Sequence, residues 1–171
     1  EDTAVRSVVV QRADVLTDAL HDTRRQLVEL RSDINTTVAV RVNEVNTLAA
    51  QIADLNAQIS KVTSVGDVPN DLYDKRDLLI EDLSKFVNIN VTQRPQGMVS
   101  ITVGGALLVE TDRSYNMEVH RKEGELEMWD IHWPRTGSPV HVESGVLKGL
   151  MDFRDQDLPN YLNHLDVLAE T

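Results

Sequence analysis

The sequence Leu48-Ala49-Ala50-Gln51-Ile52 returns seven residues later as Leu55-Asn56-Ala57-Gln58-Ile59, and this repeat decides the fold. The apolar residues around it follow one another at spacings of three and four, which places them on one narrow stripe of an α-helix. This heptad stripe consists of Val45, Leu48, Ile52, Leu55, Ile59 and Val62. Such a stripe is normally buried against another helix, so the pattern predicts a helix-packing surface and not a pocket for chemistry.

A long helix is expected to carry this stripe. Residues 2–64 contain neither Pro nor Gly, and apolar residues continue the face from Val5 toward the heptads. The segment is therefore one helix of roughly 95 Å at about 1.5 Å per residue, or two helices joined near Ser32 to Thr37. The run Asn35-Thr36-Thr37 is its weakest point, because such residues favour caps or lose rotamer freedom in a helix.

A second helix is expected at residues 71–87. Ser64-Val65-Gly66 ends the first helix, and Pro69-Asn70-Asp71 begins the next with Asn70 or Asp71 as its N-cap. Arg76 falls on the inner face, where its aliphatic stem is expected to pack.

The last helix is expected from Ser144, its N-cap, to the end of the chain. Pro159 should kink this helix or divide it in two, because proline removes one backbone donor and crowds the preceding turn. The expected inner positions are Leu147, Met151, Arg154, Leu158, Tyr161, Leu165 and Leu168.

Between these helices the apolar period changes from 3.6 to 2. The alternation predicts a hairpin with one buried face, formed by residues 89–91 and 99–103 around the turn Pro95-Gln96-Gly97. Gly104-Gly105 predicts a second tight turn before residues 106–109. Residues 115–119, 125–133 and 139–142 are weaker strand candidates.

The predicted fold class is α+β, a long-helix antiparallel bundle or coiled coil with a small inserted antiparallel β module. The helical rod comprises residues 1–87, completed by a returning helix at 143–171, and the β module comprises residues 88–142. The two later helices span only about 66 Å together. We therefore expect part of the Val5 to Leu20 face to meet segments outside this sequence or neighbouring subunits.

The composition excludes several classes of function. The 17 Lys and Arg against 28 Asp and Glu give a formal net charge of -11, and no basic cluster suggests nucleic acid. The chain has no cysteine, which excludes disulfides, thiolate metal sites and cysteine nucleophiles. No apolar run approaches the roughly 20 residues of a membrane span, and no signal peptide precedes the first helix.

The residue types suited to chemistry form no recognisable site, so we expect no enzyme, no cofactor and no metal. Acidic Asp71, Asp74 and Asp77 share one helix side, but they fit a first turn better than a cation site. His120, His132 and His141 lack the spacing of metal ligands. Trp129 and Trp133 alternate on one strand face with Ile131, as expected for a core or contact patch, with a sugar platform as the alternative. Glu125, Glu127 and Asp130 show no burial that would separate their pKa values, as a hydrolase pair requires.

Two stretches resemble a known family. The heptads, followed by Pro69-Asn70-Asp71-Leu72-Tyr73-Asp74-Lys75-Arg76-Asp77-Leu78-Leu79, are similar to a block of the flagellar hook-associated protein 1 family. The stretch Ser144-Gly145-Val146-Leu147-Lys148-Gly149-Leu150-Met151-Asp152-Phe153-Arg154, continuing to Pro159 and closing with residues 165–169, resembles that family's second signature. The resemblance covers about residues 27–171.

This resemblance implies a structural subunit at the junction between the flagellar hook and its filament. Its implied partners are other copies of itself in a ring, the hook protein and the next junction protein, with no nucleic acid and no membrane. It implies an extracellular place in the bacterial flagellum, reached by type III export without a cleaved signal peptide. The sequence would be a central part of the protein, lacking the assembly regions at both ends.

Two other classes remain as alternatives. The first is a coiled-coil adaptor or receptor-like module whose β unit binds a ligand, and the second is a hydrolase with a helical arm. Sequence outside this chain would separate them, because long amphipathic helices at both ends favour the junction protein and a transmembrane span favours the receptor.

Overall fold

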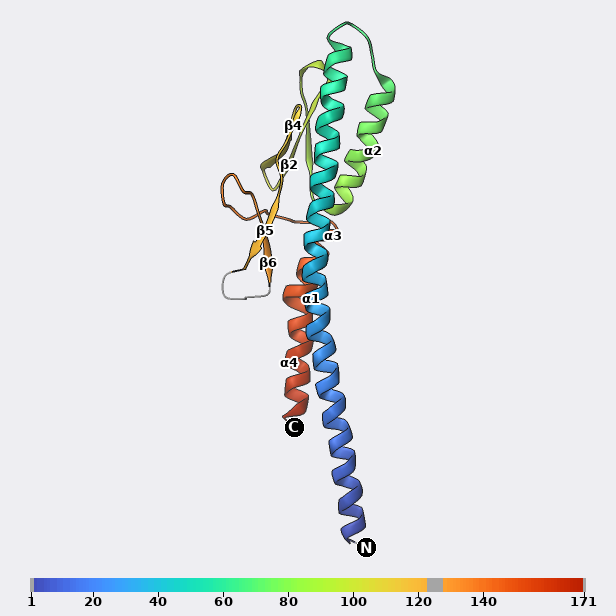
Figure 1. Cartoon of the computed structure of the whole chain (residues 1–171), viewed down its shortest axis with the longest axis vertical. Coiled ribbons are helices and arrows are strands. Elements are labelled where there is room, and N and C mark those ends of the chain that lie inside the picture. Colours follow the sequence, from blue (N-terminus) through green and yellow to red (C-terminus); the bar gives the residue numbers. More distant parts are fainter. Residues whose placement is uncertain (1, 123–127, 171) are drawn as a thin grey trace. The chain divides into compact units, whose positions relative to one another are not determined.

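The structure is a computed structural model that describes the backbone of residues 2–122 and 128–170 and the side chains of residues 5–122 and 128–170. It has the predicted α+β fold, with long helices and a small antiparallel β module (Figure 1). The chain divides into two compact units, residues 35–151 and residues 1–34 with 152–171. Each unit is described by itself.

Helix α1 runs from Asp2 to Thr63, so the first segment is one helix and not two. The polar run at Asn35 does not break it. Asn35 is only 4% exposed, and its side-chain oxygen accepts a hydrogen bond from the backbone N–H of Trp129 at 3.0 Å. Its amide thus bonds to another segment and does not compete for the helix backbone.

Helix α2 (Asn70–Phe86) lies beside the later part of α1 in the unit formed by residues 35–151 (Figure 1). The prediction that Asn70 or Asp71 is its N-cap is wrong, because Pro69 holds the N-cap position without a side-chain hydrogen bond. The carbonyl of Pro69 accepts the N–H groups of Leu72 and Tyr73 at 3.0 and 3.1 Å, so the first turn begins one residue early. Asp71 lies in that turn, where a carboxylate is favourable.

A four-stranded antiparallel sheet forms in the order β1-β2-β3-β4. Its strands are β1 (Asn90–Gln93), β2 (Val99–Val103), β3 (Ala106–Glu110) and β4 (Arg113–Ser114). The predicted hairpin is confirmed, since Val91 pairs with Ile101 across the 3-10 turn Pro95–Gly97. The Gly104-Gly105 turn is also confirmed, with both glycines at positive φ. The two-residue strand β4 was not predicted.

The expected single buried face of the first hairpin is wrong. All of β1 is exposed, whereas Ser100 of β2, expected on the polar face, is only 2% exposed. β2 is a central strand with neighbours on both sides, and the Oγ of Ser100 accepts a hydrogen bond from the Arg94 Nε at 3.0 Å. The central position of β2 and this hydrogen bond therefore bury Ser100, although the apolar-polar alternation of the sequence places it on the exposed face.

A second, two-stranded sheet joins β5 (Glu118–Arg121) to β6 (Trp129–His132). Strand β6 lies inside the weaker candidate 125–133, whereas β5 overlaps the candidate 115–119 only at residues 118 and 119. The third candidate, residues 139–142, supplies only an isolated bridge from Pro139 to His132. The candidate residues 125–127, including Glu125 and Glu127, fall outside the described residues.

The last helical region has three parts. They are α3 (Val146–Asp152), a π-helical segment (Phe153–Asp157) and α4 (Leu158–Ala169). The expected division at Pro159 is confirmed, with Pro159 in the first turn of α4. The prediction of Ser144 as N-cap is wrong, because Gly145 precedes the first helical residue.

Gly145 holds that place because only glycine fits. Its φ is +89°, and a Cβ built on it would lie 2.6 Å from the backbone carbonyl of Phe86. The start of α3 is thereby pressed against the end of α2, and the core lies beneath. That core contains residues of α1, α2, both sheets and α3, among them Val42, Leu83, Ile101, Ile131, Trp133 and Leu147.

We expect Gly145→Ala to lower the free energy of unfolding by at least 2 kcal/mol more than Gly66→Ala, as an order of magnitude for overpacking against backbone. Gly66 is the matched control, because its φ of +93° imposes the same strain while nothing lies within 4 Å of its Cβ position. Urea unfolding of both variants measures the difference. Equal losses would mean that the contact with Phe86 relaxes without cost.

Candidate packing and assembly surfaces

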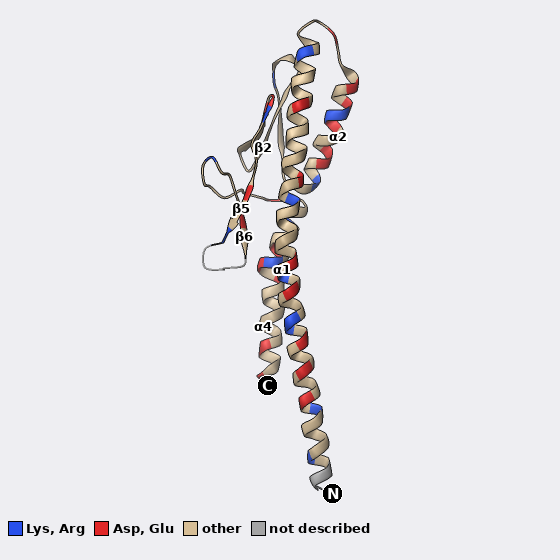
Figure 2. Ribbon diagram, in the orientation of Figure 1, with Lys and Arg blue, Asp and Glu red and all other residues tan. Residues whose placement is uncertain are grey.

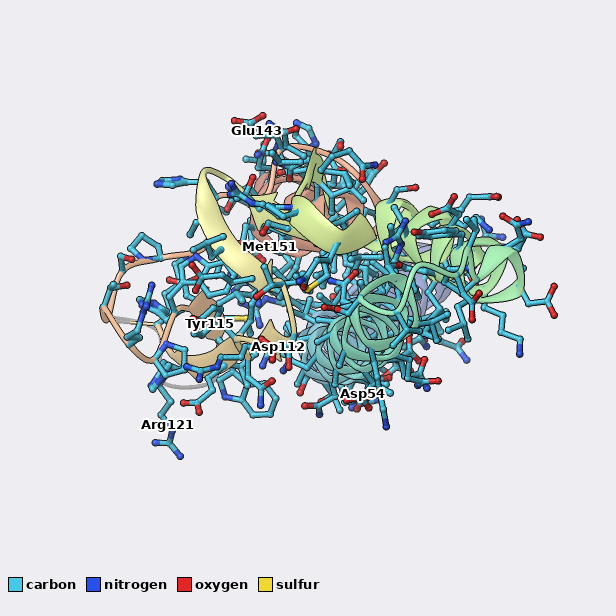
Figure 3. All side chains as sticks on the ribbon, turned by 90° about the horizontal axis from the view of Figure 1, so that it is seen from above. Asp54, Asp112, Tyr115, Arg121, Glu143 and Met151 are labelled. Atoms are coloured by element: carbon cyan, nitrogen blue, oxygen red, sulfur yellow. The ribbon has the colours of Figure 1, made fainter. Side chains whose placement is uncertain are left out.

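Within residues 35–151, the buried residues of α1 form a line with heptad spacing. This line lies to one side of the predicted heptad stripe. It consists of Val38, Val42, Val45, Ala49, Ile52, Asn56 and Ile59, each at most 2% exposed. The spacing is four and three in alternation, as in a coiled-coil stripe. Here, however, the surface facing it includes β strands as well as α2 (Figure 3).

The predicted heptad stripe therefore splits into two sets. Three of its residues, Val45, Ile52 and Ile59, are fully buried on this line. The other three, Leu48, Leu55 and Val62, are half-buried. Leu48 and Leu55 line surface hollows between α1 and α2.

The predicted end-helix residues fall in both units. Leu147 is fully buried, and Met151 packs half-buried against the same core as the heptad residues. Leu158 is 1% exposed, and Leu165 is half-buried beside Leu20 of α1 in a hollow of about 290 Å³. The use of any of these residues in assembly stays a prediction.

Three asparagines of α1 bond directly to the backbone of the β module. Asn46 donates to the carbonyl of Met117 and accepts the N–H of the same residue, both at 2.8 Å. Asn56 does the same for Val99, at 2.8 and 3.1 Å. With Asn35 they lie ten and eleven residues apart, about three helical turns, so all three face the strands.

Asn56 also joins α2 to the turn before β2. It donates to the Thr111 carbonyl at 2.6 Å, and its oxygen lies 3.4 Å from a guanidinium nitrogen of Arg76. That nitrogen donates to the carbonyl of Gly97 at 2.6 Å, and the guanidinium lies 5.2 Å from the ring centroid of Tyr73. Arg76 is 4% exposed, so its whole side chain is buried and not only its stem.

In the other unit, a buried arginine accompanies the proline of α4. Pro159 has no N–H, and in the π-helical register its missing partner is the carbonyl of Arg154. Arg31 of α1 donates its Nε to that carbonyl at 3.0 Å. The Arg154 side chain is fully buried and makes a bidentate pair with Asp155 at 2.8 and 2.9 Å, so the buried charge is neutralised.

The earlier part of α1 exposes a row of large apolar side chains. Val5, Val8, Val15 and Leu16 are 62%, 50%, 65% and 60% exposed. They recur at helical spacing on one side, and we call them the N-terminal apolar stripe. A row of this kind usually marks a contact surface.

The residues considered for chemistry are distributed over the surface. His120 and His132 stand 5.5 Å apart by ring centroids, with His120 Nε2 3.5 Å from Glu118 and His132 Nδ1 3.1 Å from the Gly137 carbonyl. Residues 2–122 and 128–170 contain no group of three or more His, Asp or Glu side chains placed to hold a metal ion. None of the helices in the described chain combines the length and hydrophobicity of a membrane span.

The tryptophan face is a core face, as one of its two interpretations predicted. Ile131 and Trp133 are 2% and 6% exposed, and Trp129 is half-buried. Trp133 borders a hollow of about 390 Å³ with Tyr115 and Arg135, whose guanidinium lies 4.9 Å from the Tyr115 ring centroid. The Tyr115 hydroxyl donates to Glu110 at 2.6 Å, and this hydrogen bond raises the pKa of Tyr115.

Sequence reasoning missed the asparagine contacts. The only signal was an Asn at position 56 inside an apolar line, with other asparagines about three turns away. A buried polar side chain must find partners, so Asn56 indicated a polar contact, but its spacing could not show which strand provides it.

We expect Asn56→Leu to lower the free energy of unfolding by roughly 3 kcal/mol or more. The variant leaves the N–H and carbonyl of Val99 and the carbonyl of Thr111 without this partner, at about 1 to 3 kcal/mol for each buried group. Asn43→Leu is the control, because Asn43 lies exposed on the same helix and should change stability by only about 0.5 kcal/mol. Similar losses in urea unfolding would show that water replaces the Asn56 contacts.

Comparison with known proteins agrees with this architecture. Flagellar hook-associated protein 1 of Salmonella typhimurium is 30% identical over 178 residues, covering 99% of this chain and 32% of that protein. The Bacillus subtilis protein of the same name is 36% identical over 94 residues, covering 55% of this chain and 18% of its own length. The chain thus spans less than a third of these relatives.

A solved structure has the same fold. The flagellar hook junction protein FlgK from Burkholderia pseudomallei superposes with a TM-score of 0.72 at 29% identity, over 85% of this chain and 28% of that one. The family described as the flagellar hook-associated protein FlgK helical domain matches residues 1–171. The chain therefore belongs to the FlgK family of flagellar hook-associated proteins and corresponds to its helical domain.

Proposed function

We propose that this chain is part of a structural subunit of the bacterial flagellum that joins the hook to the filament. The observation that carries the proposal is the match to the FlgK helical domain along the whole chain, supported by the fold shared with a hook junction protein. The side chains described above serve packing: buried apolar lines, asparagine contacts and neutralised arginines. The proposed activity is mechanical connection and not catalysis.

The proposed partners are other copies of the same protein in a ring, the hook protein on one side and the next junction protein on the other. The exposed N-terminal apolar stripe supports contacts of this kind, because large apolar side chains in a row gain free energy when covered. The proposed location is the extracellular flagellum, reached by export without a cleaved signal peptide. The division into a helical rod, residues 1–87 with 143–171, and a β module, residues 88–142, remains part of the proposal.

Within this proposal the predicted packing residues have different tasks. Val45, Ile52 and Ile59 hold the helix on its own β module, because all three are fully buried. The partly exposed Leu48, Leu55 and Leu165 retain apolar surface that another chain could cover. Assembly would then depend on the second group and folding on the first.

The full-length protein, tagged outside this domain, should localise as one spot at the distal end of each hook. Deleting its gene should leave hooks without filaments and cells without swimming motility, and the intact gene should restore both. Fluorescence microscopy and electron microscopy of hooks measure this. A tagged protein spread along the cell membrane would instead favour the receptor-like alternative.

A further inference from the structure

Two histidines that are far apart in the sequence meet on one face of the two-stranded sheet β5–β6 (Figure 1). In the register of these strands, His120 pairs with Asp130 and Glu118 pairs with His132. Residues that pair directly lie on the same face of an antiparallel sheet. Two imidazoles and two carboxylates therefore share this face, which we call the histidine face. The opposite face carries Ile131, which belongs to the core.

The histidine face borders a hollow of about 660 Å³. In it the ring centroids of His120 and His132 are 5.5 Å apart, and the two rings are inclined at 75°. With Zn–N bonds of about 2.1 Å, two imidazoles bound to one tetrahedral zinc ion have ring centroids roughly 5 Å apart. The pair therefore needs only small side-chain rotations to bind one ion, and the His120 side chain, 54% exposed, has room to turn.

One ring nitrogen of each histidine already faces a partner that fixes its proton. His132 Nδ1 lies 3.1 Å from the carbonyl of Gly137. A carbonyl can only accept a hydrogen bond, so Nδ1 donates and the neutral ring keeps its lone pair on Nε2. His120 Nε2 lies 3.5 Å from a carboxylate oxygen of Glu118, and with its N–H directed there the neutral ring keeps its lone pair on Nδ1. Histidines that bind metal ions in proteins donate their other N–H to a carbonyl or a carboxylate in the same way.

The loop after β6 holds the carbonyl of Gly137 in place. The carbonyl of Trp133 accepts the N–H of Gly137 at 2.8 Å, and Trp133 donates its own N–H to the carbonyl of Ser138 at 2.9 Å. Pro139 then forms a bridge back to His132. Trp133 is only 6% exposed, so this loop is attached to the core. The orientation of the His132 ring is thus set by the fold before any ion binds.

The charges and ligand types around the histidine face determine which class of ion it suits. The acidic residues of β5 and β6, red in Figure 2, balance Arg121 and Lys122, which also border the hollow. Arg121 pairs with Trp129 on the opposite face and extends away from the ribbon (Figure 3). Because these charges cancel, the hollow attracts Mg²⁺ and Ca²⁺ weakly, and those ions need several oxygen ligands. Imidazole nitrogens instead suit Zn²⁺, Cu²⁺ and Ni²⁺.

We propose that His120 and His132 together bind one divalent transition-metal ion, for which Zn²⁺ has the fitting geometry. The two imidazoles supply two ligands and water completes the tetrahedron, since the described part of the chain offers no group of three suitable side chains. The bound ion links β5 to β6, and a two-stranded sheet is only marginally stable without further support. The sequence expectation of no metal missed this pair because only strand pairing brings the two histidines together. The site does not depend on the proposed junction role.

Isothermal titration calorimetry of the full-length protein, prepared without a polyhistidine tag, tests the site with Zn²⁺. His120→Ala and His132→Ala should each lose one equivalent of bound zinc or bind it at least tenfold more weakly. His141→Ala is the matched control, because His141 is exposed and does not border the hollow, and it should bind zinc as the wild type does. Circular dichroism confirms that each variant is folded. Zinc binding that is unchanged in folded His120→Ala and His132→Ala, or equally strong binding of Mg²⁺ at this site, would overturn the proposal.

Copper provides a second readout, because Cu²⁺ binds a given set of nitrogen ligands more tightly than Zn²⁺ does. Electron paramagnetic resonance of bound Cu²⁺ should detect two imidazole nitrogens in the wild-type protein and in His141→Ala. In His120→Ala and in His132→Ala this two-nitrogen signal should be absent, since each variant keeps only one of the two ligands. A two-nitrogen signal that persists in either variant would show that other residues bind the ion, and the paired-histidine site would be rejected.

Discussion

The unit formed by residues 35–151 depends on one buried amide, the side chain of Asn56. Its donor and acceptor serve the carbonyl and N–H of Val99, and it also reaches Thr111 and the guanidinium of Arg76. Three elements that are far apart in sequence, α1, α2 and the first sheet, therefore share one polar contact inside an apolar core. Without it the N–H and carbonyl of Val99 would be buried and unpaired, and Arg76 would keep only its bond to Gly97, which makes the contact strongly cooperative.

The same contact explains how a helix can cover a sheet. Val99 pairs with Gln93 on one side, while pairing of β2 with β3 begins only at Ser100. The backbone groups left open at Val99 are taken by Asn56, and those of Met117, just before β5, are taken by Asn46. α1 thereby closes strand positions that would otherwise expose backbone groups to other chains.

Periodicity could predict which element forms, but not which side of it is covered. Apolar spacing alone places Val45, Ile52 and Ile59 on one stripe, and all three are buried. Leu48 and Leu55 share that stripe, yet remain half-buried because α2 covers only one side of them. The N-cap at Ser144 was wrong because the start of α3 is set by the close approach of Gly145 to Phe86, which a local pattern does not contain. The N-cap at Asn70 was wrong because the first turn of α2 already bonds to the carbonyl of Pro69. The asparagine contacts depend on strands 43 to 94 residues away, so no local signal could assign their partners.

The asparagines also show why polar groups are retained on an apolar line. A leucine at position 56 would gain transfer free energy, but it would pack against the sheet at more than one axial position. An amide that pairs with the N–H and carbonyl of one residue fits at a single register, as a buried Asn does in a coiled coil. Asn46 repeats this at Met117 about three turns away, so helix and sheets are fixed at two points. In a subunit whose proposed task is to join neighbours mechanically, fixing the register in this way keeps α1 in constant alignment with the β module.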